Sequence, residues 1–156
     1  MSDDADTPPT PRTSQTEPPI FGACLCRGVR FKIELPTLFC GHCHCTMCQR
    51  NHGAAYVTWF GIPWDRMQIV EGESLLTRHD SSDHGTRSFC SRCGTSLFCE
   101  STQHAEHVDI PLANMDGDID RPPQLHFYFD SHKEWVALED GLPRLGGESG
   151  DQPIEE

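Results

Sequence analysis

Seven of the nine cysteines in this chain fall into three short clusters whose spacing is typical of metal ligands. The sequence reads CLC at residues 24–26, CHCTMC at residues 43–48, and CSRC at residues 90–93, where a glycine follows. Cysteines spaced in this way can direct their thiolates at one ion about 2.3 Å from each sulfur. A pair of buried, unreactive thiols is the alternative for any single cluster, but several clusters in one chain favour metal binding.

Zinc in proteins is tetrahedral, so seven thiolates fill one site and leave three ligands for a second. The economical division gives a closed, structural site to Cys24, Cys26, Cys90 and Cys93. It gives an open site, where zinc can do chemistry, to Cys43, Cys45 and Cys48. The second of these two zinc ions per chain would be the labile one, because an open thiolate site is easier to oxidise or strip. The alternative is a second structural site closed by Cys40, His42, His44 or His52.

The chemistry best suited to an open three-thiolate site is the binding and activation of another thiol. Three thiolates and Zn²⁺ carry a net negative charge, which makes the site a modest Lewis acid. A thiol arriving at the open position would lose its proton and become a nucleophile. His44, wedged between two of the cysteines, is interpreted as a support for the ligands, with a catalytic role as the alternative. Arg50, beside Cys48, is a candidate partner for a carboxylate of the substrate, with solvation at the surface as the alternative.

The rest of the chain indicates short strands and turns that bring these clusters together. A length of 156 residues is that of one ordinary domain. Twelve prolines and thirteen glycines interrupt it, and only 36% of it is apolar, which favours a mainly β fold. Residues 1–19 are predicted to be a disordered, acidic, proline-rich leader and residues 144–156 an acidic C-terminal tail, and residues 20–143 between them hold all three cysteine clusters.

The charge pattern argues against two classes of partner. The formal net charge is −12 and the chain has no cluster of lysines and arginines, so we expect no nucleic acid and no anionic membrane as partner. No apolar run approaches the roughly 20 residues of a membrane span, and none resembles a secretory signal. The expected location is the cytoplasm, where thiols stay reduced and clustered cysteines favour metal binding over disulfides.

Four stretches of the sequence resemble one known family. They read GACLCRGVRFKI, CHCTMCQRNHGAAY, RSFCSRCGTSLF and HFYFDSHKEW, and the resemblance covers about residues 20 to 143. The family is that of the glutathione-dependent formaldehyde-activating enzymes, which includes the relatives of centromere protein V. Two stretches differ from the usual pattern of the family, which has a glycine directly after the C-x-C and a G-x-L-D turn later in the chain. Here Arg27 follows Cys26, and residues 113–116 read ANMD.

The resemblance implies a fold, a pair of metal sites and a reaction. The implied fold is a β-tent of short antiparallel sheets organised around a structural zinc site. The resemblance also implies that residues 20–143 form a zinc-binding catalytic domain. Cys24, Cys26, Cys90 and Cys93 match the structural ligands, and Cys43, Cys45 and Cys48 match the catalytic ones. The implied activity is that of a carbon–sulfur lyase run in the synthetic direction, in which glutathione and formaldehyde give S-hydroxymethylglutathione.

Two other functions stay open at the level of sequence. The first is a non-catalytic binding module held together by zinc, because a fold does not fix a function. The second is methionine-sulfoxide reduction on a similar scaffold, which needs a free catalytic cysteine and a resolving partner. Only Cys40 and Cys99 lie outside the clusters and are available for those two roles.

Overall fold

The computed structural model describes residues 17–154, so nearly all of the predicted leader lies outside the described residues. The strands are β1 (Ile20–Ala23), β2 (Arg30–Ile33), β3 (Phe39–Cys43), β4 (Val57–Pro63), β5 (Met67–Glu71), β6 (Leu76–Asp80), β7 (Gly85–Cys90), β8 (Ser96–Ser101), β9 (His107–Pro111), β10 (His126–Phe127), β11 (Leu145–Gly146) and β12 (Gln152–Pro153). One α-helix, α1 (Thr46–His52), and five 3-10 turns complete them: η1 (Trp64–Arg66), η2 (Glu73–Leu75), η3 (Thr102–His104), η4 (Leu112–Asn114) and η5 (Phe129–Ser131). No helix within residues 17–154 combines the length and apolar character needed to cross a membrane.

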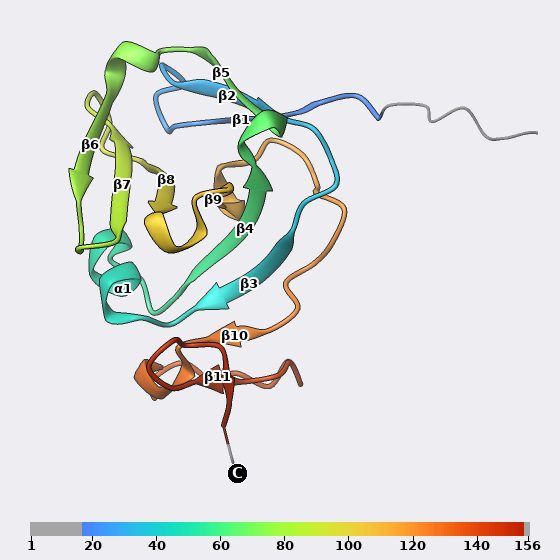
Figure 1. The fold of residues 1–156 in the computed structure, drawn as a ribbon, viewed down its shortest axis with the longest axis vertical. Helices are drawn as coiled ribbons and strands as arrows, with labels where there is room; N and C mark the ends of the chain where they lie inside the picture. Colours follow the sequence, from blue (N-terminus) through green and yellow to red (C-terminus); the bar gives the residue numbers. More distant parts are fainter. Residues whose placement is uncertain (1–16, 155–156) are drawn as a thin grey trace, which may run out of the picture.

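Three sheets make up the described part of the chain. The largest has seven strands in the order β10-β3-β4-β9-β8-β7-β6, a second has the order β1-β2-β5, and β11 pairs with β12. Every pair of named strands is antiparallel except β10 with β3, which run parallel. Figure 1 shows the three-stranded sheet at the top of the molecule and β10, with the C-terminal segment, at the bottom below β3. The prediction of a mainly β fold is confirmed.

The main core lies between the small sheet and the middle of the large one. Phe31 and Ile33 of β2 are fully buried there with Phe60 of β4, Leu97 of β8 and Ile110 of β9. Phe31 and Phe98 pack edge to face, with 5.2 Å between ring centroids. Alternate residues of a strand point to opposite faces, so these short strands deliver apolar side chains to one interior. Cys24 and Cys90 are members of this same core.

A second, smaller core cluster lies where α1 meets β3 and β4. Its buried members are Cys43, Cys48, Val57 and Trp59, and the partly buried Phe39, Cys45, Cys99 and Tyr128 pack against them. The two groups of cysteines therefore belong to different parts of the interior. Each group is supported by its own apolar neighbours.

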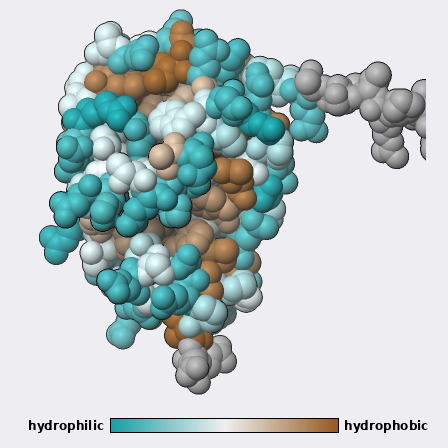
Figure 2. All heavy atoms as spheres, in the orientation of Figure 1, coloured by the Kyte–Doolittle hydropathy of each residue, from teal (hydrophilic) through white to brown (hydrophobic). Residues whose placement is uncertain are grey.

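Most of the face seen in Figure 2 is hydrophilic, and apolar side chains gather there in a few patches at the upper rim and the right side. Large hydrophobic side chains that stay exposed within residues 17–154 include Leu25 and Trp135, which are 83% and 75% exposed. Leu25 lies between two cysteines, in the turn that joins β1 to β2. A residue between two converging ligands points away from them, which accounts for its exposure.

Candidate metal centres

Four cysteines from distant parts of the chain meet beside the main core. The ligand atoms of Cys24, Cys26, Cys90 and Cys93 all lie within 4.8 Å of one another. The Sγ atoms of Cys24 and Cys26 are 3.5 Å apart, and those of Cys26 and Cys90 are 3.8 Å apart. Tetrahedral zinc with bonds of about 2.3 Å to sulfur requires sulfur atoms about 3.8 Å apart. The four residues thus fit a closed thiolate site.

Two turns shape this group. The first follows β1, where the backbone N–H of Val29 donates to Sγ of Cys24 over 3.2 Å. The second follows β7, where Gly94 has φ +78° and donates its N–H to the carbonyl of Cys90 over 2.7 Å. Glycine suits this left-handed conformation because it has no Cβ to clash. The hydroxyl of Thr95 is 3.2 Å from Sγ of Cys93, and their hydrogen bond lowers the pKa of that thiol to about 5.

Three further cysteines meet where β3 runs into α1. The ligand atoms of Cys43, Cys45 and Cys48 lie within 4.8 Å of one another, and within residues 17–154 no other Cys, His, Asp or Glu joins their group. Cys45 is the N-cap of α1, and its sulfur accepts a hydrogen bond from the backbone N–H of Cys48 over 3.3 Å. The capping hydrogen bond turns Cys45 back toward Cys48. The helix ends at His52, and Gly53 caps it with φ +59°.

The three thiols influence one another's ionisation. Hydrogen bonds with Cys43 and Cys48 lower the pKa of Cys45, whereas a hydrogen bond with Cys45 raises the pKa of Cys43. One buried thiolate is therefore stabilised at the expense of its neighbours. A bound cation would stabilise all three in the thiolate form, because metal binding releases the protons of its cysteine ligands.

Arg87 of β7 is a buried cation that lies against the three-cysteine group. Its side chain is only 6% exposed, and one guanidinium nitrogen donates to Sγ of Cys48 over 3.5 Å. The guanidinium also lies over the ring of Trp59, 5.9 Å from the centroid. No carboxylate within residues 17–154 forms an ion pair with it. Since a buried charge needs a counter-charge, the sulfurs of this group are the groups placed to supply it once they are ionised.

The predicted extra ligands of the second site lie elsewhere. Cys40 belongs to the main core, where burial raises the pKa of its thiol to about 11. His42 is hydrogen bonded to Thr58 over 2.8 Å, and His52 packs edge to face on Trp59. His44 is 1% exposed and faces His126. None of the four belongs to the group formed by Cys43, Cys45 and Cys48.

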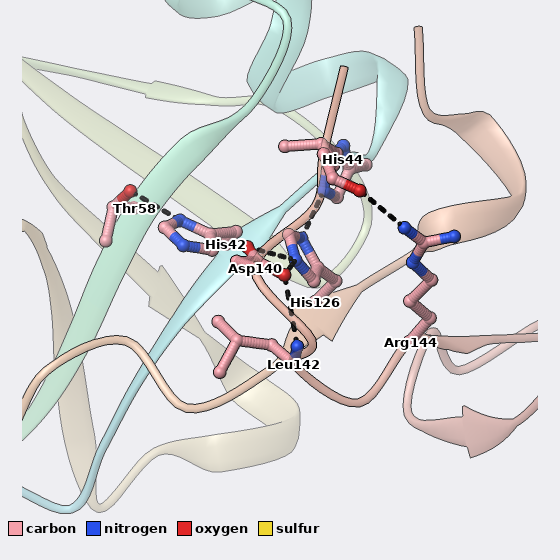
Figure 3. A network of polar contacts seen from close by, with 8 residues as sticks. His42, His44, Thr58, His126, Asp140, Leu142 and Arg144 are labelled. Carbon is pink, nitrogen blue, oxygen red and sulfur yellow. Dashed lines mark hydrogen bonds and ion pairs between the residues drawn. The ribbon is translucent and has the colours of Figure 1, made fainter. Parts of the chain in front are cut away.

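A hydrogen-bonded chain behind His44 contains two residues that sequence reasoning missed. Nε2 of His44 lies 2.8 Å from Nδ1 of His126, whose Nε2 lies 2.9 Å from Oδ2 of Asp140 (Figure 3). Burial, followed by the nearby His126 ring, lowers the pKa of His44 to about 4, so this ring is neutral near pH 7. The available signal was His126 itself: a histidine within the apolar run LHFYF is costly to bury without a polar partner.

The two stretches that differ from the usual family pattern contact each other. Arg27 forms a two-pronged ion pair with Asp116, with distances of 3.1 Å and 2.8 Å between nitrogens and oxygens. Arg27 has φ +59°, a conformation that favours glycine. The pair with Asp116 holds an arginine in that conformation, and both side chains stay about half exposed. Arg50, the predicted contact for a substrate carboxylate, is exposed on α1.

A cavity of about 210 Å³ lies beside α1 and the turn after β7. Its lining is mostly polar and includes Asn51, His79, Arg87, Ser88, Phe89, Gly94 and Ser96. Arg87 therefore takes part both in this cavity and in the contact with Cys48. The cavity is smaller than the roughly 300–1,000 Å³ usual for drug-sized ligands.

The fold and the two cysteine groups define a class: small, mainly β proteins whose clustered thiols could hold metal ions. Residues 19–131 match the model of the glutathione-dependent formaldehyde-activating enzyme family. This match spans more than half of the chain, and the protein belongs to that family.

Individual proteins agree with this assignment. A Halomonas elongata protein described as a candidate glutathione-dependent formaldehyde-activating enzyme is 27% identical over 126 residues, which are 76% of this chain and 80% of that protein. An uncharacterised lyase of Schizosaccharomyces pombe is 32% identical over 88 residues, 52% of this chain and 57% of that one. The crystal structure of a Rhodobacter sphaeroides protein, 21% identical, superposes with a TM-score of 0.55 over 65% of this chain and 92% of that one. This last likeness concerns the fold alone.

Proposed function

We propose that this chain is a zinc-dependent enzyme of the carbon–sulfur lyase type that acts on a thiol–aldehyde adduct, with glutathione and formaldehyde as the pair of substrates. The observation that supports it best is the three-cysteine group, which has no fourth ligand grouped with it in the described part of the chain. Zinc, when bound there, supplies a cation that holds a thiol sulfur and lowers its pKa. The family match and the names of its relatives favour glutathione as that thiol.

The proposed reaction adds a thiol across a carbonyl. The sulfur of glutathione forms a bond to the carbon of formaldehyde, the C=O π bond breaks, and the thiol proton ends on the oxygen. Cys43, Cys45 and Cys48 would hold the ion at which this occurs, while Cys24, Cys26, Cys90 and Cys93 would hold a structural one. The reaction needs no oxidant and no reductant.

The surroundings of the three cysteines suit an anionic thiol substrate. The positive charge of Arg87 offsets the negative charge of a zinc ion held by three thiolates. The cavity that Arg87 shares would receive one polar end of glutathione, which carries two carboxylates. In the same proposal Arg50, exposed on α1 two residues after Cys48, contacts a carboxylate outside the cavity.

Removal of metal provides the direct test of this function. Protein with two zinc equivalents is expected to accelerate the exchange between free formaldehyde and S-hydroxymethylglutathione, measured by NMR with ¹³C-formaldehyde. Protein from which a chelator has removed the weaker equivalent should leave the exchange at its uncatalysed rate, and added zinc should restore the acceleration. If fully loaded protein gives no acceleration, the chain is a binding module and the proposed reaction is wrong.

Arg87 gives a second prediction for the same site. The substitution Arg87→Met removes the charge next to Cys48 and keeps much of the apolar volume. It is expected to weaken binding of the second zinc equivalent by at least about fivefold, because a charge within contact distance is worth about 1–4 kcal/mol. Competition with a chromophoric chelator measures this affinity. Arg87→Lys restores a positive charge, so its affinity for the second zinc equivalent should lie between those of the wild type and Arg87→Met. An unchanged affinity in Arg87→Met would show that Arg87 is not the counter-charge.

A further inference from the structure

Three imidazole rings lie together behind the three-cysteine group. His126 of β10 pairs with His42 of β3 in the parallel register, and the ring centroids of these two residues are 5.0 Å apart. The rings of His44 and His126 are also 5.0 Å apart. Figure 3 shows the His126 ring between His42 and His44, with Asp140 beside it. His126 has no exposed surface and His44 has 1%, so the contact between them is shielded from water.

The position of these rings fixes the direction of the cysteines. Successive side chains of an extended segment point to opposite faces. His42 and His44 both face His126, so Cys43 and Cys45 point to the other face. Rotation of this segment about its own axis would turn His44 away from His126 and both sulfurs away from Cys48. A side chain that fixes the orientation of His44 therefore also sets the direction of the Cys43 and Cys45 side chains.

We propose that Asp140 and His126 are positioning residues for the three-cysteine site, and that they act through His44 to hold Cys43 and Cys45 in the orientation that binds metal. The inference rests on the metal site of the proposed function and not on its reaction. Asp140 lies outside residues 19–131, the part of the chain that matches the family model. Asp140 and His126 are 14 residues apart in the sequence, and His126 and His44 are 82 residues apart.

The carboxylate of Asp140 orients the whole chain of hydrogen bonds. It accepts from the backbone N–H of Leu142 over 3.1 Å and can only accept from His126 as well. Nε2 of His126 is then the donor, and in the neutral tautomer that this requires, its Nδ1 accepts from Nε2 of His44. Nδ1 of His44 is left with the lone pair and has no hydrogen-bond partner within residues 17–154. Both rings thus carry their proton on Nε2, which long-range ¹H–¹⁵N NMR spectra report.

Backbone contacts tie the same two segments together. The N–H of His44 donates to the carbonyl of Phe127 over 2.9 Å. The side-chain amide of Gln49 in α1 donates to the carbonyls of His44 and Ser131, each over 2.9 Å. The segment that contains His126 thus supports the start of α1 as well as the end of β3. The imidazole chain adds the orientation of the side chains, which backbone contacts alone do not set.

Three variants of the full-length protein test this inference. Asp140→Ala removes the acceptor of the His126 proton. It is expected to lower the affinity for the second metal equivalent about 10–100-fold, the usual effect of losing a residue that orients ligands. Asp140→Asn keeps an oxygen that can accept from His126 and should recover most of the affinity. Glu139→Ala removes the neighbouring exposed charge and should bind like the wild type. Titration with Co²⁺ separates the two sites, because thiolate charge-transfer absorption reports each equivalent as it binds.

The outcomes separate this inference from the proposed function. Loss of affinity in Asp140→Ala at the second site alone, with loss of the Nε2-protonated form of His44 in the NMR spectrum, supports it. Wild-type affinity in Asp140→Ala, or equal weakening at both sites, overturns it while leaving the proposed reaction standing. Protein that binds two ions but fails the formaldehyde assay overturns only the reaction. A wild-type chain that binds a single ion overturns both.

Discussion

Cys93→Ser is expected to unfold much of the protein. Cys93 supplies one of four sulfurs that join the turn after β1 to the turn after β7, and Cys24 and Cys90 extend this group into the main core. Binding of a structural zinc contributes about 10–16 kcal/mol in small zinc domains, against a net stability of only about 5–15 kcal/mol for a typical domain. Loss of even 4 kcal/mol lowers the melting temperature of a domain of this size by roughly 10–15 °C. Thermal unfolding followed by circular dichroism measures the change.

Cys99→Ser is the matched control for this prediction. Cys99 is partly buried like Cys93 but belongs to neither group of cysteines. Cys99→Ser should lower the free energy of unfolding by about 1 kcal/mol, the usual effect of a single substitution. It should leave both metal equivalents in place. A Cys93→Ser protein that melts within a few degrees of Cys99→Ser would mean that the four-cysteine group does not hold the fold together.

Local spacing predicted that the cysteines within each cluster lie together, but spacing alone does not say which clusters pair, and the division into two groups also needed the ligand count of zinc. C-x-C and C-x-x-C turns must each converge, and four ligands per ion leaves few ways to divide seven thiols. The structure brings together Cys24, Cys26, Cys90 and Cys93, and separately Cys43, Cys45 and Cys48. Frequent prolines and glycines sufficed to predict a mainly β fold. The roles of the two groups stay predictions.

The residues around the ligands could not be predicted in the same way. His126 reaches His44 only because β10 pairs in parallel with β3, and no local pattern in a two-residue strand specifies that partner. Asp140 lies in a turn, where an aspartate is usually a turn former. Arg87 is buried against Cys48 because β7 lies between β6 and β8 in the large sheet. Long-range pairing decides these contacts, and no local pattern of residues specifies that pairing.

The two departures from the family pattern show how such contacts can compensate each other. An arginine directly after the first C-x-C is unfavourable by itself, because the turn requires a positive φ at that position. Asp116 stands 89 residues away in the sequence and forms two hydrogen bonds to that arginine. The pair is exposed, so solvent screens it and its net contribution to stability is small. That is enough to offset part of the strain of one left-handed residue, so the turn keeps its shape beside Cys26.

Cys48→Ser is expected to remove the second metal equivalent and the activity while leaving the fold largely intact. Cys48 belongs to the smaller core cluster, not to the main core. Serine keeps an oxygen that can accept from Arg87, so the guanidinium is not left without a partner. A hydroxyl does not ionise near neutral pH, however, and two thiolates do not hold the ion at an open site. Elemental analysis should fall from two zinc equivalents to one, and the exchange of formaldehyde should fall to its uncatalysed rate.

Cys40→Ser is the matched control, because Cys40 is as buried as Cys48 but lies in the main core and in neither cysteine group. Its substitution should lower stability more than Cys48→Ser does, since it places a hydroxyl in an apolar interior, yet both zinc equivalents and the activity should remain. A larger loss of stability in Cys40→Ser, together with a loss of metal in Cys48→Ser alone, would show that Cys40 is a core residue and Cys48 a metal ligand. Equal collapse of Cys48→Ser and Cys93→Ser would contradict the division into one structural and one catalytic site, because both groups would then be needed for folding.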